Sequence, residues 1–168
     1  MTIWGSIKRG VLIGFLNEQK IDEAAKDPAC TIHGLEILAM AGAASALGYL
    51  AFGDIMPGII ATLIGFFILY SFFNFAAKML GGKAKGVEFF RAIASAYVLY
   101  FLVAIPYINI YASFVMGFWL MFVSMYVIKK LHGLSMGKSI LAVVVPFILT
   151  TMALSFFMLS MGLSLTGG

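Results

Sequence analysis

Charged residues divide the chain into four long uncharged runs, at residues 37–53, 55–77, 92–128 and 139–168. A helix that crosses the roughly 30 Å hydrocarbon core of a bilayer needs about 20 apolar residues. The second and fourth runs can each supply one such helix, and the first reaches the required length when residues 33–36 are included. The pattern therefore predicts membrane-spanning helices, and the third run is long enough for two of them.

The third run contains one interior break, Ile105-Pro106-Tyr107-Ile108-Asn109. Proline disfavours helix at the residue before it, and asparagine is costly in the middle of a membrane. We therefore predict five spanning helices, at about 33–53, 56–78, 88–106, 110–130 and 137–163. The expected fold is an all-α integral membrane protein, with a five-helix transmembrane domain over residues 29–168.

The composition supports a membrane location. Hydrophobic residues make up 62% of the 168 positions and charged residues 11%, and the mean hydropathy is +1.05. Soluble domains have about 45–50% apolar and about 25% charged residues, so the excess apolar surface must face lipid. The single cysteine, Cys30, rules out an internal disulfide and a multi-cysteine metal site. No catalytic motif appears either, so we expect no catalytic, cofactor-binding or metal-binding residues and no enzymatic activity.

All eleven lysines and arginines lie in three segments of the chain. These are the N-terminal segment, the connection between the second and third helices, and the connection between the fourth and fifth. The other two connections and the C-terminus have none. Because lysine and arginine resist translocation and collect on the cytoplasmic side, we predict a cytoplasmic N-terminus and an external C-terminus. Five helices satisfy this arrangement.

Residues 1–28 form a separate, amphipathic cytoplasmic segment. We expect a helix that lies in the cytoplasmic membrane interface, with its tryptophan at headgroup depth, or alternatively one packed under the bundle. Next in the chain, His33 and Glu36 are spaced to share a hydrogen bond at the start of the first span, or simply to cap the helix. The apolar positions of the amphipathic segment are Ile3, Trp4, Ile7, Val11, Leu12, Phe15 and Leu16, with Lys8, Arg9, Glu18 and Gln19 toward the other side.

The stretch HGLSMGKS, residues 132–139, ends like a phosphate-binding loop. Such a loop needs a glycine five residues before its Gly-Lys-Ser/Thr end and follows a buried strand. Here Gly133 is one position too close, and the segment follows a spanning helix. We therefore predict a tight turn between antiparallel helices, in which Gly133 ends one helix and Ser135 caps the next.

The first predicted helix contains a run of small residues, AMAGAASALG, at 39–48. Gly42 and Ala46, like Ala44 and Gly48, are small pairs four residues apart. Small faces let two helices approach closely. We expect this face to pack inside the bundle, with a homodimer interface as the alternative. Pro146 should kink the last helix.

Three segments carry a resemblance to a known family. They are GVEFFRAIASAYV at 86–98, the break IPYIN that follows, and KKLHGLSMGKSILAVVVP at 129–146. The chain resembles the Yip1 domain family, whose members are small five-helix membrane proteins with a cytoplasmic N-terminus. Eukaryotic members act in vesicle traffic and associate with small GTPases and with each other. The compact form here is similar to prokaryotic members, so the resemblance implies a multi-pass protein of a prokaryotic cell membrane.

Two functional hypotheses remain. The first is a non-enzymatic scaffold or adaptor that forms homo-oligomers or binds another membrane protein and anionic lipids, with no nucleic acid or nucleotide partner. Its candidate contacts are the basic residues Lys83, Lys85, Arg91, Lys129, Lys130 and Lys138. The alternative is a small-solute or ion channel or permease formed by a homo-oligomer. Its candidate polar lining is Asn74, Tyr97, Tyr100, Thr150 and Ser155.

Overall fold

The computed structural model describes the backbone of residues 2–166 and the side chains of residues 2–153, 155, 156 and 159. Five helical segments are long and apolar enough to cross a membrane, which confirms the predicted number. They are formed by α3 (Ala29–Gly48), η1 with α4 (Phe52–Asp54 and Ile55–Met79), α5 with η2 (Gly86–Ala96 and Tyr97–Ala104), α6 (Asn109–His132) and the first part of α7 (Met136–Thr166).

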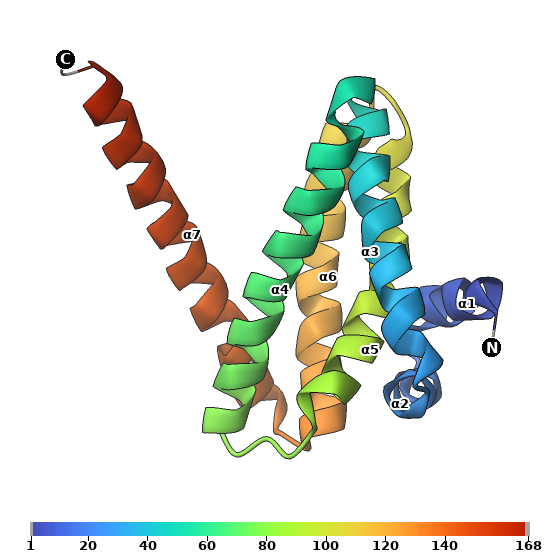
Figure 1. The fold of residues 1–168 in the computed structure, drawn as a ribbon. Helices are drawn as coiled ribbons and strands as arrows, with labels where there is room; N and C mark the ends of the chain where they lie inside the picture. Colours follow the sequence, from blue (N-terminus) through green and yellow to red (C-terminus); the bar gives the residue numbers. More distant parts are fainter. Residues whose placement is uncertain (1, 167–168) are drawn as a thin grey trace.

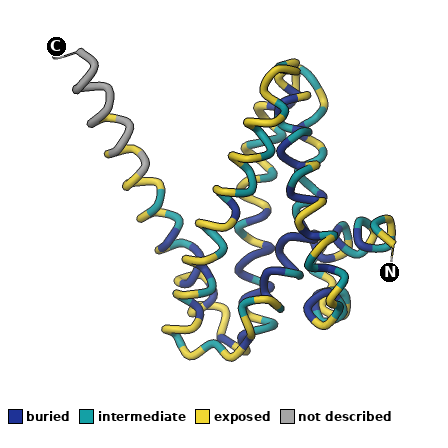
Figure 2. Tube along the Cα trace, in the orientation of Figure 1, coloured by how far each residue is buried: buried dark blue, intermediate teal, exposed yellow. Residues whose placement is uncertain are grey.

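The spanning helices α3, α4, α5–η2 and α6 stand side by side as a bundle (Figure 1). The α3–α4 and η2–α6 connections lie at the upper end of this view, and the α4–α5 and α6–α7 connections lie at the lower end. Helix α7 starts at the lower end, contacts α4 and α6, and then diverges from the bundle. Buried residues concentrate in the lower and middle parts of the bundle, whereas the outer side of α4 is largely exposed (Figure 2).

Two spans differ from their expected form. The first helix begins at Ala29 and ends at Gly48, where the chain turns through Leu50 with a positive φ of 54°. The third span is an α-helix only as far as Ala96 and continues as a 3₁₀-helix to Ala104. A 3₁₀ stretch of this length inside a span is uncommon. Hydropathy does not distinguish the two kinds of helix, because both present the same apolar side chains to lipid.

The small residues of α3 serve packing within the chain. A Cβ added at Gly42 would lie 2.6 Å from the carbonyl oxygen of Gly58 in α4. Gly48, at the end of α3, lies directly against the carbonyl oxygen of Val103 in η2. These close approaches need glycine, because any side chain would push the backbones apart. The small face of α3 therefore packs inside the bundle, against α4 and η2, as expected.

The N-terminal segment forms two helices, α1 (Ile3–Gly14) and α2 (Glu18–Lys26), where the sequence pattern predicted one amphipathic helix. The chain reverses at Leu16, whose φ is 63°, and the Asn17 side chain accepts a hydrogen bond from the Lys20 backbone N–H at 3.1 Å. An asparagine N-cap satisfies a free amide of a new helix, so the break has a local cause. Both helices pack on α5.

Candidate functional site

Most charged residues lie on elements in the lower half of the bundle in Figure 1 or on the N-terminal helices beside it. Apart from Asp54 at the opposite end and Glu36 on α3, they lie on α1 and α2, on the two lower connections, and on the helix ends beside these connections. The structure thus brings together the three basic segments that are far apart in sequence. We refer to this region as the charged end.

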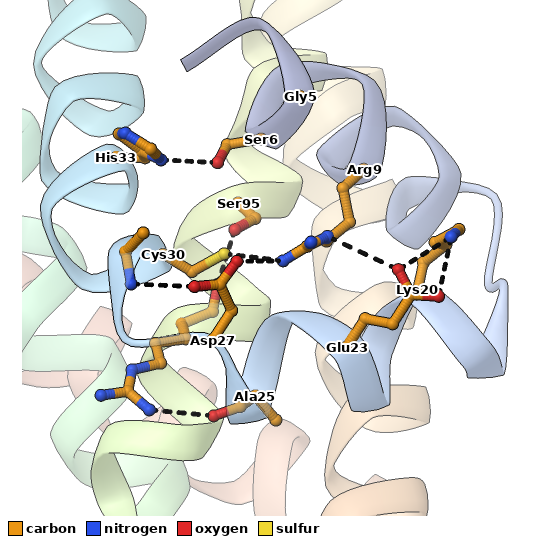
Figure 3. A network of polar contacts seen from close by, with 12 residues as sticks. Gly5, Ser6, Arg9, Lys20, Glu23, Ala25, Asp27, Cys30, His33 and Ser95 are labelled. Atoms are coloured by element: carbon orange, nitrogen blue, oxygen red, sulfur yellow. Dashed lines mark hydrogen bonds and ion pairs between the residues drawn. The ribbon is translucent and has the colours of Figure 1, made fainter. Parts of the chain in front are cut away.

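An ion-pair network holds α1, α2 and the start of α3 together (Figure 3). Arg9 in α1 is largely buried, and its Nη1 lies 3.0 Å from Asp27 Oδ2 and 3.1 Å from Cys30 Sγ. Its Nε also lies 3.8 Å from Glu23 Oε2, and Glu23 in turn accepts a hydrogen bond from Lys20 Nζ at 2.7 Å. The sequence pattern assigned Arg9 to the polar outer side of the helix. In the folded chain its side chain points inward and links α1 to α2 and to the start of α3.

The acids of this network are stabilised in their charged form. Burial acts to raise the pKa of Asp27, but hydrogen bonds from Arg9 and from the Ala29 backbone N–H, together with the charge of Arg9, outweigh it. The pKa of Asp27 therefore lies below its usual value. A hydrogen bond from Lys20 lowers the pKa of Glu23, and one from Lys130 lowers that of Glu18. A hydrogen bond to a carboxylate favours its ionised form.

A second group of hydrogen bonds joins α5 to α2 and α3. Arg91 Nε donates to Thr31 Oγ1 at 2.8 Å, and its Nη1 donates to the Ala25 backbone carbonyl at 3.1 Å. The Ser95 hydroxyl donates to the Arg91 carbonyl one turn later in α5. Arg91, a predicted lipid or partner contact, is thus occupied by contacts within the protein.

Lys130 is also paired within the protein. Its Nζ lies 2.9 Å from Glu18 Oε2 and 3.5 Å from Asp22 Oδ2, and both acids belong to α2. Tyr126, one turn earlier in α6, donates to the other oxygen of Glu18 at 2.7 Å. These contacts fasten α2 to the lower end of α6.

The other predicted basic contacts lie on the two lower connections or on the helix ends beside them, and the two connections touch each other. The Lys83 backbone N–H donates to the His132 carbonyl at 3.3 Å, and Lys138 Nζ donates to the Leu80 carbonyl at 3.2 Å. The side chains of Lys83, Lys85, Lys129 and Lys138 are all exposed, and none forms an ion pair with an acid among the described residues. We call these four residues the basic loop face.

The HGLSMGKS segment is the predicted turn. Gly133 ends α6 with a φ of 66°, in the left-handed region that favours glycine. Ser135 Oγ accepts from the Lys138 backbone N–H at 3.5 Å at the start of α7. The neighbouring His132 ring is buried, packs edge-on against Phe89, and has no hydrogen-bond partner for either nitrogen among the described residues.

The five predicted polar lining residues are distributed over separate places. Tyr97 and Tyr100 line a cavity inside the bundle. Asn74 is partly buried beside Gly86, and its Oδ1 has no described partner. Thr150 lies in a groove between α4 and α7, where its hydroxyl donates to the Pro146 carbonyl at 2.8 Å. Ser155 is exposed on the diverging part of α7.

Some contacts of the N-terminal helices had no clear signal in the sequence. His33 hydrogen-bonds the Ser6 hydroxyl in α1 at 2.7 Å (Figure 3), whereas its spacing had suggested Glu36 as a partner. Trp119 Nε1 in α6 donates to the Gly14 carbonyl at the end of α1 at 2.9 Å. The glycines at 10 and 14 of α1, spaced like a packing face, were the one available hint that α1 packs closely on another helix.

These features define a multi-pass helical membrane protein with a pair of N-terminal helices fixed to its charged end. The family model for the Yip1 domain matches residues 17–158. The chain therefore belongs to the Yip1 domain family, as its sequence resemblance had suggested. The comparison with curated proteins gives no match. The comparison with solved structures gives none either.

Proposed function

We propose that this protein is a non-enzymatic membrane scaffold or adaptor of the Yip1 type, in a prokaryotic cell membrane. In this proposal the N-terminus and the charged end face the cytoplasm and the C-terminus faces the outside. The helices anchor the protein, which oligomerises or holds a partner membrane protein, and the charged end binds that partner together with anionic lipid.

The basic loop face is the observation that carries this proposal. Its four lysines lie on or directly beside two different connections, which the Lys83–His132 and Lys138–Leu80 contacts hold against each other. Positive charges that lie at the surface and form no ion pair with a described acid of the protein attract anionic lipid headgroups or an acidic partner. Arg91 is hydrogen-bonded to Thr31 and Ala25, and Lys130 pairs with Glu18 and Asp22, so the proposal does not rest on these two residues.

The exposed side of α1 supports a position at the membrane interface. Trp4 and Phe15 are each 70% exposed, and Leu12 is exposed on the same helix. Tryptophan beside other exposed apolar side chains is typical of helices that lie at headgroup depth. The opposite side of α1 is fixed to the bundle, so α1 would enter the interface as part of the folded domain.

Native mass spectrometry of the protein, extracted gently from its own membrane, tests the proposal. We expect a stoichiometric second protein, or an oligomer that retains anionic phospholipid. In a matched pair of variants, Lys83→Gln/Lys85→Gln should lose retained lipid or partner. Lys8→Gln/Lys26→Gln, with the same change in charge, should keep them.

A closed homo-oligomer that carries neither lipid nor partner would contradict the scaffold and favour the channel alternative. That alternative would then be tested by solute flux in proteoliposomes, with Asn74→Leu as the variant expected to abolish the flux.

A further inference from the structure

A cavity of about 580 Å³ lies inside the bundle, bounded by α3, α4, α5–η2, α6 and the start of α7. No charged residue lines it. Its walls are rich in aromatic rings, among them Phe66 and Tyr97, whose centroids are 5.0 Å apart and nearly perpendicular. Ligand sites commonly have this volume and a mostly apolar, aromatic lining with a few polar groups. The cavity is thus built like a site for a small, uncharged molecule.

The hydroxyl groups around the cavity are the unusual feature. Several serine and threonine side chains of the helices donate to the carbonyl four residues earlier, as Thr151 does to Phe147. Two of the residues that line the cavity also donate to backbone carbonyls, Ser124 to Leu120 and Tyr70 to Gly86. By contrast, five hydroxyl-bearing residues that line the cavity have no side-chain hydrogen bond to any described residue. They come from four elements and are Ser45, Thr62, Tyr97, Tyr100 and Ser113.

Unpaired hydroxyls are costly in a membrane interior, where no bulk water can satisfy them. One such group is unremarkable, but five that converge on one uncharged cavity call for a common partner. Hydroxyls can donate to carbonyl oxygens and can also accept from hydroxyl groups. The partner would therefore carry carbonyl or hydroxyl oxygens. It would be uncharged, because the residues that line the cavity supply no opposite charge.

The cavity reaches the lipid-facing surface between α4 and α6. Gly65 of α4 and Gly117 of α6 both line it, and a Cβ added at either would meet no atom within 4 Å. Phe114 and Phe118 line it too, and they are 68% and 51% exposed. Helix α7 diverges from the bundle, so its far half does not cover this side (Figure 1). A ligand could enter sideways from the bilayer.

We propose that this cavity binds a neutral, lipid-soluble ring compound with carbonyl or hydroxyl oxygens, of the quinone type, whose apolar tail extends into the bilayer. Flat rings stack on aromatic walls, and the five hydroxyls hold the ring oxygens. This inference is independent of the scaffold function, since it uses none of the charged end.

Photolabelling in nanodiscs of phosphatidylcholine tests the proposal. The probe is an azido-benzoquinone with a decyl tail, and the competitor is the same quinone without the azide. We expect label in peptides that contain residues 61–73 and 113–121, competed by the unlabelled quinone. Gly65→Leu and Gly117→Leu should block the mouth and reduce labelling at least tenfold, whereas Gly53→Leu, which has equal space around it but lies outside the cavity, should label normally.

A second variant keeps the test decisive if the leucine variants do not fold. Tyr97→Phe/Tyr100→Phe retains both rings and removes two hydroxyls. The competitor concentration for half displacement should rise about fivefold or more, because the loss of even one hydrogen bond weakens binding about fivefold. The proposal is overturned if label is absent, spreads over the lipid-facing surface, or is unchanged in all these variants. It is also overturned if a diazirine-tailed phosphatidylcholine labels the same peptides and the quinone does not compete, because the occupant is then an ordinary lipid chain.

Discussion

Gly10 of α1 packs directly on the carbonyl oxygen of Ser95 in α5, so closely that a methyl group at position 10 would overlap it. This contact sets the distance between the N-terminal helices and the bundle. The Arg9 network and the Trp119–Gly14 hydrogen bond lie on either side of it along α1. The charged end therefore depends on a close helix–helix approach that only glycine permits.

Gly10→Ala should destabilise the protein by about 1–3 kcal/mol, because overpacking at a close contact forces the backbones apart. Thermal unfolding in detergent should show a lower Tm, and hydrogen exchange should rise in residues 3–14 before the rest of the chain. Gly117→Ala is the control, since a Cβ there meets nothing and alanine favours helix. An unchanged Tm for Gly10→Ala would mean that α1 is not held at this point.

Acid should loosen the N-terminal helices. The pKa of Asp27 is lower in the folded protein than its usual value, so its pairing stabilises the fold fully above about pH 4. That contribution is lost as the pH falls through the folded-state pKa. Glu18 and Glu23 have lowered pKa values as well, so they act in the same direction.

The measurement is Tm between pH 6 and pH 3. The wild type should lose stability steeply below about pH 4. Asp27→Asn should start from a lower Tm and show a shallower decline. Asp54→Asn, at the opposite end of the bundle and outside this network, should follow the wild type. Identical slopes for wild type and Asp27→Asn would show that the Arg9–Asp27 pair contributes nothing to stability.

Arg91 should behave as a structural residue. Arg91→Gln removes the guanidinium contacts to Thr31 and the Ala25 carbonyl, so we expect a loss of about 1–3 kcal/mol. Arg91→Lys should restore little, because a single ammonium group lacks the two-directional donors of the guanidinium. Chemical unfolding followed by fluorescence measures this. If Arg91→Gln had wild-type stability but bound lipid more weakly, Arg91 would be a lipid contact and not a structural residue.

The exposed lysines should affect binding without affecting stability. Lys83→Gln/Lys85→Gln should weaken binding of vesicles that contain anionic lipid about fivefold per lysine at low salt, and less at higher salt. The Tm should stay within error of the wild type. Lys8→Gln/Lys26→Gln carries the same change in charge. An equal loss of vesicle binding in both variants would show that net charge alone causes the effect and that the basic loop face has no special role. Sedimentation with phosphatidylglycerol vesicles measures the binding.

Much of the fold could be predicted from hydropathy and charge alone. The five spans follow from uncharged runs separated by charged segments, and Pro106 with Asn109 marks the division of the longest run. Gly133 and Ser135 specified the turn after α6, because each residue has a conformational or capping preference that acts locally. The Yip1 resemblance also depended on these local features, and the family match over residues 17–158 agrees with it.

The candidate site was less predictable, because residue type does not reveal a partner. Lys83, Arg91 and Lys130 look equivalent in the sequence, yet Lys83 is exposed while Arg91 and Lys130 are engaged by α2 and α3. Which cation is free depends on where the N-terminal helices dock. That docking depends on Gly10 meeting Ser95, a contact between positions far apart in the chain.

The sequence by itself determined the membrane class, the number of helices and the clustering of charge, because apolar length and charge act locally. Only the tertiary structure decided that Arg9 turns inward, that α1 and α2 separate at Leu16, and that five unpaired hydroxyls from four elements line one cavity. The reason is physical. A side chain becomes a surface group, an internal tie or a cavity wall according to which helix packs beside it, and helix packing is set by contacts between distant residues.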